Sequence, residues 1–236
     1  MTSGRYTAVV FDLDDTVCRR TQNAAALYRQ AFDHAGIEQF GEPADLWQAL
    51  SGPPTPNAER AYFAAGFTVV AARHERTDAD PDALAEGLLA SIDHGAVTFA
   101  IGAEAALAAA NEDGPVGVLT NGPEWRQSQK LSALGVIDDL DAVVYAGDMA
   151  RRKPHRDPFD RICSILGTES AETLYVGDSL EHDVAGGQGA GLPVAWVQGT
   201  EAGGETDGAG GPDPDPFAPE HVLASLEEFE RVLTDA

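Results

Sequence analysis

The sequence has very little lysine, little cysteine and no long hydrophobic run. Of its 236 residues 15 are basic, but only two of these are lysines, Lys130 and Lys153. The 39 acidic residues outnumber the basic ones and give a formal net charge of -24. A charge of this sign repels nucleic acids and anionic membrane surfaces. We therefore expect neither a nucleic-acid partner nor a membrane partner.

The scarcity of cysteine and of apolar runs bears on where the protein works. Cys18 and Cys163 are far apart in the sequence, and neither has a second Cys or His at metal-ligand spacing beside it. They are expected to be small buried side chains in a reducing compartment. No segment has the length of a membrane span, and the first fifteen residues reach charged side chains before any apolar stretch typical of a signal peptide. These features predict a soluble, cytoplasmic protein.

The acidic balance also indicates a salty environment. At molar ionic strength the Debye length falls to about 3 Å, so the repulsion between surface carboxylates is largely screened. An acidic, well hydrated surface is then tolerated. The composition therefore favours a halophilic protein.

The hydrophobic pattern predicts an α/β fold. The 43% of hydrophobic residues is sufficient for a packed core. From about residue 101 to residue 199, short apolar runs rich in β-branched residues alternate with helical patterns, several of which end in glycine. Together with the first run, the expected strands are 7–13, 114–122, 141–148, 173–179 and 193–199. This alternation is typical of a doubly wound parallel sheet with helices on both faces.

The stretch 19–94 differs, because it has Ala-rich helical patterns and few strands. We predict that it is a helical cap domain inserted into a catalytic core formed by 1–18 and 95–236. An insert directly after the first strand follows the strand end that lines the ligand crevice of such sheets, so we expect it to act as a lid. Near the end of the chain, 199–219 is rich in Gly, Pro and Asp and predicts a loop, whereas 220–233 has helical spacing.

Polar side chains follow four of the predicted strands and should meet at one edge of the sheet. Several carboxylates in one buried place require a cation or hydrogen bonds, and carboxylate oxygens suit Mg²⁺. A lysine and a strand-end hydroxyl suit a phosphate group. The set consists of Asp12 and Asp14, Thr120 and Asn121, Lys153, and Asp178 with Asp183. It predicts phosphoryl transfer assisted by Mg²⁺.

Four short motifs carry these residues in order: "DLDDT", "VLTNG", "RKP" and "VGDSLEHD". They resemble the four motifs of the haloacid dehalogenase (HAD) superfamily, whose members are mostly phosphatases, and the helical insert resembles the cap of its first subgroup. The resemblance implies a Mg²⁺-dependent phosphatase that hydrolyses a small phosphomonoester through an aspartyl phosphate. The "DDT" version of the first motif and "LTNG…KLSALG" resemble nucleotidases and sugar-phosphate phosphatases. A nucleoside monophosphate or a sugar phosphate is therefore the expected substrate, and the enzyme is expected to be a monomer or small homo-oligomer.

The resemblance also implies roles for individual residues. Asp12 would be the nucleophile and Asp14 the general acid and base, with Mg²⁺ bound by Asp12, the backbone carbonyl of Asp14 and Asp178. Asp183 would bind or orient that metal shell. Thr120, Asn121 and Lys153 would bind the substrate phosphate, with Thr120 and Lys153 also taking part in catalysis. Thr16 is expected to be a structural hydroxyl. Asp15 stands where the family often has glycine, so the turn there must accept a side chain.

Three alternatives remain within this fold. A 2-haloacid dehalogenase needs a carboxylate nucleophile but no leaving-group acid, so the presence of Asp14 argues against it. A phosphomutase would return the phosphoryl group to a sugar instead of giving it to water. A catalytically inactive binding protein is disfavoured because Asp12 and Asp14 are both present.

Overall fold

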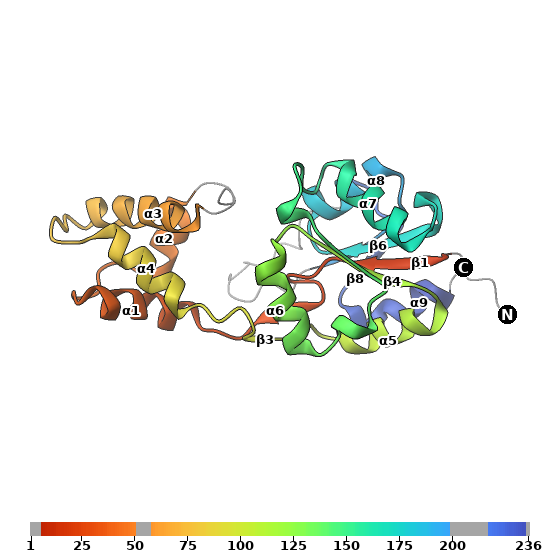
Figure 1. Cartoon of the computed structure of the whole chain (residues 1–236), viewed down its shortest axis with the longest axis horizontal. Helices are drawn as coiled ribbons and strands as arrows, with labels where there is room; N and C mark the ends of the chain where they lie inside the picture. Colours follow the sequence, from red (N-terminus) through yellow and green to blue (C-terminus); the bar gives the residue numbers. More distant parts are fainter. Residues whose placement is uncertain (1–5, 51–57, 199–216, 235–236) are drawn as a thin grey trace. The chain divides into compact units, whose positions relative to one another are not determined.

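The structure, a computed structural model, describes residues 6–50, 58–198 and 217–234. The chain forms two compact units, which we call the core unit (Met1–Arg20 with Val97–Ala236) and the helical unit (Thr21–Ala96). Figure 1 shows the helices and strands of both. That the helical unit acts as a cap stays a prediction.

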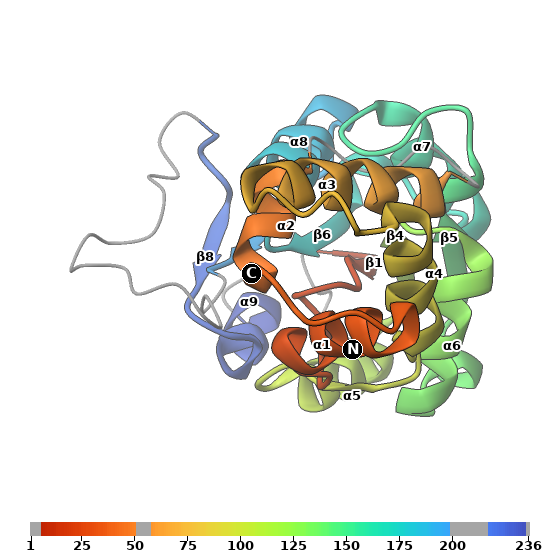
Figure 2. The ribbon, with the colours of Figure 1, turned by 90° about the vertical axis from the view of Figure 1, so that its left-hand side faces the viewer.

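The core unit contains a six-stranded sheet with the order β5-β4-β1-β6-β7-β8. All neighbouring strands in it are parallel, and Figure 2 shows β5 and β8 on opposite sides of the sheet. The strands are β1 (Ala8–Phe11), β4 (Val116–Thr120), β5 (Ala142–Tyr145), β6 (Thr173–Gly177), β7 (Val194–Val197) and β8 (His221–Leu223). The chain builds the sheet from β1 outward to β4 and β5, and then continues on the other side of β1 with β6, β7 and β8. In parallel sheets the ligand crevice lies at the carboxyl ends of the strands where the order reverses in this way, which is here the end of β1. The predicted doubly wound parallel sheet is confirmed.

Alternate side chains of the strands fill two separate hydrophobic cores. In β1, Val9 and Phe11 belong to one core together with residues of α5 and α9. Val10 belongs to the other core, with residues of α7 and α8. The α-helices of this unit are α5 (Ala103–Asp113), α6 (Glu124–Leu134), α7 (Arg156–Leu166), α8 (Gly186–Ala190) and α9 (Phe229–Thr234). Shorter turns are the 3₁₀ segments η1 (Ile137–Asp139), η2 (Ala146–Asp148), η3 (Ser170–Glu172) and η5 (Leu226–Glu228), and the π-helical segment η4 (Leu180–Ala185). The β1 segment is thus buried on both faces, which explains its continuous apolar run.

Two features of the core unit differ from the sequence expectations. The predicted helix at 220–233 is wrong at its start, because His221–Leu223 pairs with β7 and forms the edge strand β8; the helical part follows as η5 and α9. A second, two-stranded antiparallel sheet joins β2 (Cys18–Arg20) to β3 (Val97–Phe99) and was not expected. The loop expected at 199–219 lies, except for its last three residues, outside the described residues.

The helical unit consists of α1 (Ala24–Ala35), α2 (Pro43–Ala49), α3 (Glu59–Arg73) and α4 (Pro81–Ser91). Its own hydrophobic core includes Tyr28, Phe32, Phe67 and Leu84. These α-helices agree with the helical patterns expected for 19–94. Among the helices in the described part of the chain, none is both long and apolar enough to cross a membrane.

The C-terminal segment packs against the start of α5 at a glycine. Gly102 has a φ of +80°, and a Cβ atom added to it would lie 2.2 Å from the backbone nitrogen of Glu227. This position therefore requires glycine for both its conformation and its close contact. Gly135 also has a positive φ, +74°, but nothing lies within 4 Å of a Cβ placed there.

We expect Gly102→Ala to lower the free energy of unfolding of the core unit by roughly 2–4 kcal/mol, through left-handed strain and overpacking together. Gly135→Ala introduces the same backbone strain without the contact and should cost about 1 kcal/mol. Urea unfolding of both variants measures the difference. Equal losses would show that the C-terminal segment does not pack closely on Gly102.

Candidate active site

The "DLDDT" turn places its acidic residues directly after β1. The backbone N–H of Cys18 donates to the carbonyl of Leu13 at 2.9 Å, and the N–H of Asp15 donates to the carbonyl of Cys18 at 2.9 Å. Asp15 has a φ of 63°, a conformation that is unusual outside glycine but is tolerated by Asp. The turn thus accepts a side chain at this position. It leaves Asp12 at the strand end and Asp14 two residues further on.

Lys153 is the centre of the buried part of the site. Its ammonium group contacts Asp12 Oδ1 at 2.5 Å, Asp183 Oδ1 at 2.7 Å, the hydroxyl of Tyr175 at 2.8 Å and the carbonyl of Leu119 at 3.2 Å. Only 4% of Lys153 is exposed. Burial by itself lowers the pKa of this amine, but the two carboxylates outweigh that effect and raise the pKa above its ordinary value. Lys153 is therefore a permanent positive charge that joins β1, β4 and β6.

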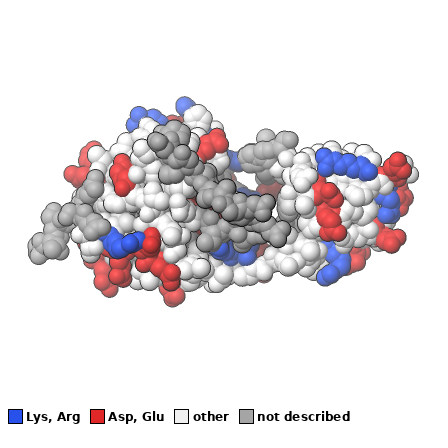
Figure 3. All heavy atoms as spheres, turned by 180° about the vertical axis from the view of Figure 1, so that it is seen from behind, with Lys and Arg blue, Asp and Glu red and all other residues white. Residues whose placement is uncertain are grey.

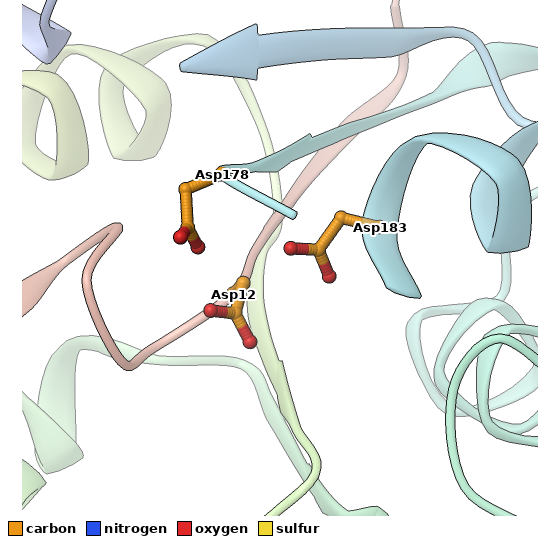
Figure 4. Close-up of side chains that lie close together, drawn as sticks. All are labelled: Asp12, Asp178 and Asp183. Atoms are coloured by element: carbon orange, nitrogen blue, oxygen red, sulfur yellow. The ribbon is translucent and has the colours of Figure 1, made fainter. Parts of the chain in front are cut away.

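Three carboxylates gather around the end of β1. Ligand oxygens of Asp12, Asp178 and Asp183 all lie within 4.8 Å of one another, and Figure 4 shows these side chains turned toward a common space. Burial raises the pKa of Asp12 well above its ordinary value although Lys153 opposes the shift. Burial and the charge of Asp183 raise the pKa of Asp178 to about 6. Because three carboxylates face one ammonium, the donor set fits a divalent cation with a preference for oxygen.

Asp178 and Asp183 differ in how their oxygens are used. Asp183 Oδ1 accepts from Lys153, and its Oδ2 accepts from the backbone N–H of Ser179 at 3.0 Å. Asp178 Oδ1 accepts a hydrogen bond of 2.9 Å from the hydroxyl of Thr16. Asp178 is half-buried, whereas only 1% of Asp183 is exposed. The arrangement suits Asp178 as an ion ligand and Asp183 as a group that orients Lys153.

The "TNG" segment after β4 uses its two polar side chains differently. Thr120 Oγ1 accepts from the amide of Gln127 at 2.6 Å and from the backbone N–H of Gly122 at 3.3 Å. Both contacts use the oxygen as an acceptor, so the O–H proton of Thr120 stays available for a ligand. Asn121 instead exchanges two hydrogen bonds with the backbone of Lys153, at 2.9 and 3.1 Å. Its side chain therefore joins the loop after β4 to the loop that carries Lys153.

Asp14 is held by two side chains of α6. Its Oδ1 forms an ion pair with the ammonium of Lys130, and its Oδ2 accepts from the amide of Gln127 at 2.7 Å. Burial raises the pKa of Asp14, but Lys130 and these hydrogen bonds lower it overall below the ordinary value. The sequence analysis missed both partners. The available signal was that Lys130 is one of two lysines and lies three residues from Gln127, on the same face of a helix.

The structure therefore buries both lysines of the chain in this site. Lys130 is 1% and Lys153 4% exposed. The basic side chains on the surface in Figure 3 are consequently arginines. This very acidic protein thus has only two lysines, and the ammonium group of each lies beside a carboxylate of the site. Lys153 lies beside the buried Asp12, and Lys130 lies beside the half-buried Asp14.

Comparison with known proteins identifies the family. The model of the haloacid dehalogenase-like hydrolase family matches residues 6–191. This match covers most of the chain, which therefore belongs to the haloacid dehalogenase-like hydrolases. The prediction of a hydrolase of this superfamily is confirmed.

Individual relatives cover almost the same length. The chain is 28% identical over 233 residues to a pyrimidine 5'-nucleotidase of Escherichia coli, covering 95% of this chain and 96% of that protein. It is 28% identical over 219 residues to a ribulose-1,5-bisphosphate 5-phosphatase of Halopiger xanaduensis, covering 86% of this chain and 89% of the relative. The fold is also that of the HAD-hydrolase YfnB of Bacillus subtilis, solved bound to magnesium, with a TM-score of 0.71 and 23% identity over 98% of this chain and 99% of that one.

The charge balance of the site predicts opposite effects of two isosteric substitutions on stability. Asp12→Asn removes one of three crowded carboxylates while Lys153 keeps Asp183, so the metal-free protein should be at least as stable as the wild type. Asp183→Asn disrupts the contacts to Lys153, Tyr175 and Ser179 and should cost roughly 2 kcal/mol or more.

Thermal unfolding in the presence of a chelator measures both effects. A change of about 1 kcal/mol in the free energy of unfolding should shift the melting temperature by about 2–4 °C in a chain of this size. A lower melting temperature for Asp12→Asn than for Asp183→Asn would contradict this charge balance.

Proposed function

We propose that the protein is a Mg²⁺-dependent phosphatase that hydrolyses a small phosphomonoester through an aspartyl phosphate on Asp12. The observation that carries this proposal is the position of Asp12 at the end of β1, 2.5 Å from Lys153 and grouped with Asp178. A nucleophilic carboxylate, a fixed positive charge and an oxygen-rich cation site are what the reaction requires. The phosphatase names of the two curated relatives support the same assignment.

The proposed cation ligands are the carboxylates of Asp12 and Asp178 and the backbone carbonyl of Asp14. Bound there, Mg²⁺ neutralises negative charge on the nucleophile and on the phosphate. Without the cation, burial and neighbouring carboxylates raise the pKa values of Asp12 and Asp178, and a bound cation would oppose that shift. Thr16 fixes Asp178, and Asp183 fixes Lys153.

In the first step, a carboxylate oxygen of Asp12 attacks phosphorus while the bond between phosphorus and the ester oxygen breaks. Asp14 gives its proton to the leaving oxygen, so that an alcohol departs. The ammonium of Lys153 and the O–H of Thr120 bind the phosphoryl oxygens and stabilise their charge in the transition state.

In the second step, water attacks the phosphorus of the aspartyl phosphate. Asp14, now a carboxylate, takes the proton of that water, and the bond from phosphorus to the Asp12 oxygen breaks. Inorganic phosphate leaves, the carboxylate of Asp12 is restored and Asp14 is protonated again.

The proposed substrates are nucleoside monophosphates and sugar phosphates, the classes in the names of the two relatives. We assign their selection to the helical unit, because it is inserted between β2 and β3, and β2 is the short strand that follows the turn with Asp12 and Asp14. The acidic composition favours an enzyme adapted to a salt-rich cytoplasm.

A screen of phosphomonoesters with Mg²⁺ at molar salt should show phosphate release by the wild-type enzyme. Asp12→Asn cannot form the aspartyl phosphate, and we expect it to reduce turnover by about 1,000-fold or more while the protein stays folded. Phosphate assays together with circular dichroism check both points. Turnover by Asp12→Asn at the wild-type rate would contradict the nucleophile assignment.

Chelation should remove phosphatase activity, and Mg²⁺ should restore it. Asp178→Asn loses one proposed ligand and should need roughly 10–100-fold more Mg²⁺ for half-maximal activity. A titration of phosphate release against Mg²⁺ concentration gives these values. Full phosphatase activity in chelator would reject the cation site, and chloride release from 2-haloacids under those conditions would favour the dehalogenase alternative.

A further inference from the structure

Lys130 and Gln127 lie outside the four motifs, yet both touch Asp14. Lys130 pairs with Oδ1 of Asp14, and Gln127 donates to Oδ2. A carboxylate bound at both oxygens has a fixed plane and direction. Asp14 itself lies in a turn beside Asp15 with its positive φ, and 39% of its side chain is exposed. Because the side chain of Asp14 is only partly packed by its surroundings, the contacts with Lys130 and Gln127 determine the direction of its carboxylate.

The burial of Lys130 indicates that its contact with Asp14 serves the function of the site. Only 1% of this residue is exposed, and taking an ammonium group out of water costs several kcal/mol unless a partner offsets it. A methionine or leucine would fill the same space in α6 without that cost. The carboxylate that offsets the charge is Asp14, the residue proposed as general acid and base.

Gln127 extends the arrangement to the phosphate-binding hydroxyl. Its amide nitrogen lies 2.7 Å from Asp14 Oδ2 and 2.6 Å from Thr120 Oγ1. Gln127 is completely buried, and its Oε1 has no hydrogen-bond partner among the described residues. The amide is thus oriented by two acceptors on the site side, one from each of the first two motifs.

We propose that Lys130, with Gln127, is a positioning residue that aims the carboxyl group of Asp14 at the leaving oxygen and at the hydrolytic water. This inference rests on the proposed phosphatase function. Lys130 acts through Asp14 and does not touch the substrate. Its loss should therefore matter only in steps that use Asp14.

The choice of leaving group separates this role from a structural one. An alkyl phosphate needs proton donation by Asp14 in the first step, whereas p-nitrophenyl phosphate releases a stable phenolate without it. Because kcat/KM reports on steps up to departure of the leaving group, Lys130→Met should lower kcat/KM by about 10–100-fold for the alkyl phosphate and by less than about 3-fold for p-nitrophenyl phosphate. Asp14→Asn should show the same selectivity more strongly.

A double-mutant cycle of Lys130 and Asp14 is the decisive experiment. If Lys130 acts through Asp14, adding Lys130→Met to Asp14→Asn should cause no further loss with either substrate. Gln129→Met, an exposed change on the same helix, is the matched control and should behave as the wild type. Melting temperatures identify folded variants, and Lys130→Gln replaces Lys130→Met if the latter does not fold.

The outcomes are distinct. Selective loss with the alkyl phosphate and non-additivity with Asp14→Asn support the positioning role. Equal losses with both substrates, additive losses in the cycle, or no loss would overturn it while leaving the phosphatase function intact. A wild-type enzyme that hydrolyses neither substrate would overturn the proposed function itself, and this inference with it.

Discussion

The contact between the ammonium of Lys153 and the carboxylate of Asp12 is the interaction on which the site depends. It joins segments that are 141 residues apart and brings the loop after β5 against the end of β1. The same ammonium binds Asp183 and Tyr175, so the end of β6 is fixed as well. One buried charge therefore organises three strand ends. It leaves negative charge in excess, which is the condition for binding a divalent cation.

The sequence was sufficient to predict the parts of the fold that follow from local patterns. Apolar runs such as 7–13 and 173–179 contain the strands β1 and β6 because both faces of the sheet are covered by helices, and glycines such as Gly135 end helices as expected. Asp12, Asp178 and Lys153 could be grouped because parallel strands present their carboxyl ends at one edge. The helix expected at 220–233 was wrong at its start, since His221–Leu223 adds to the exposed edge of β7, a tertiary interaction with no local pattern.

The contacts between side chains in the site could not be read from the sequence. The "TNG" motif gave no sign that the amide of Asn121 exchanges hydrogen bonds with the backbone of Lys153. Lys130 and Gln127 looked like ordinary helical residues, because nothing local shows that their face of α6 meets the turn after β1. Charge was the available clue: in a chain with 39 acidic residues and two lysines, each lysine stands beside a carboxylate of the first motif.

The most direct test of the account is to look for the phosphoryl group on Asp12. The Asp14→Asn variant should accept the group from p-nitrophenyl phosphate and hydrolyse the aspartyl phosphate slowly, because it lacks the base for the second step. With a radiolabelled phosphoryl group, acid quenching and peptide mapping should find the label on the peptide that contains Asp12. Release of nitrophenol by this variant with no label on that peptide, at any time during turnover, would contradict the account.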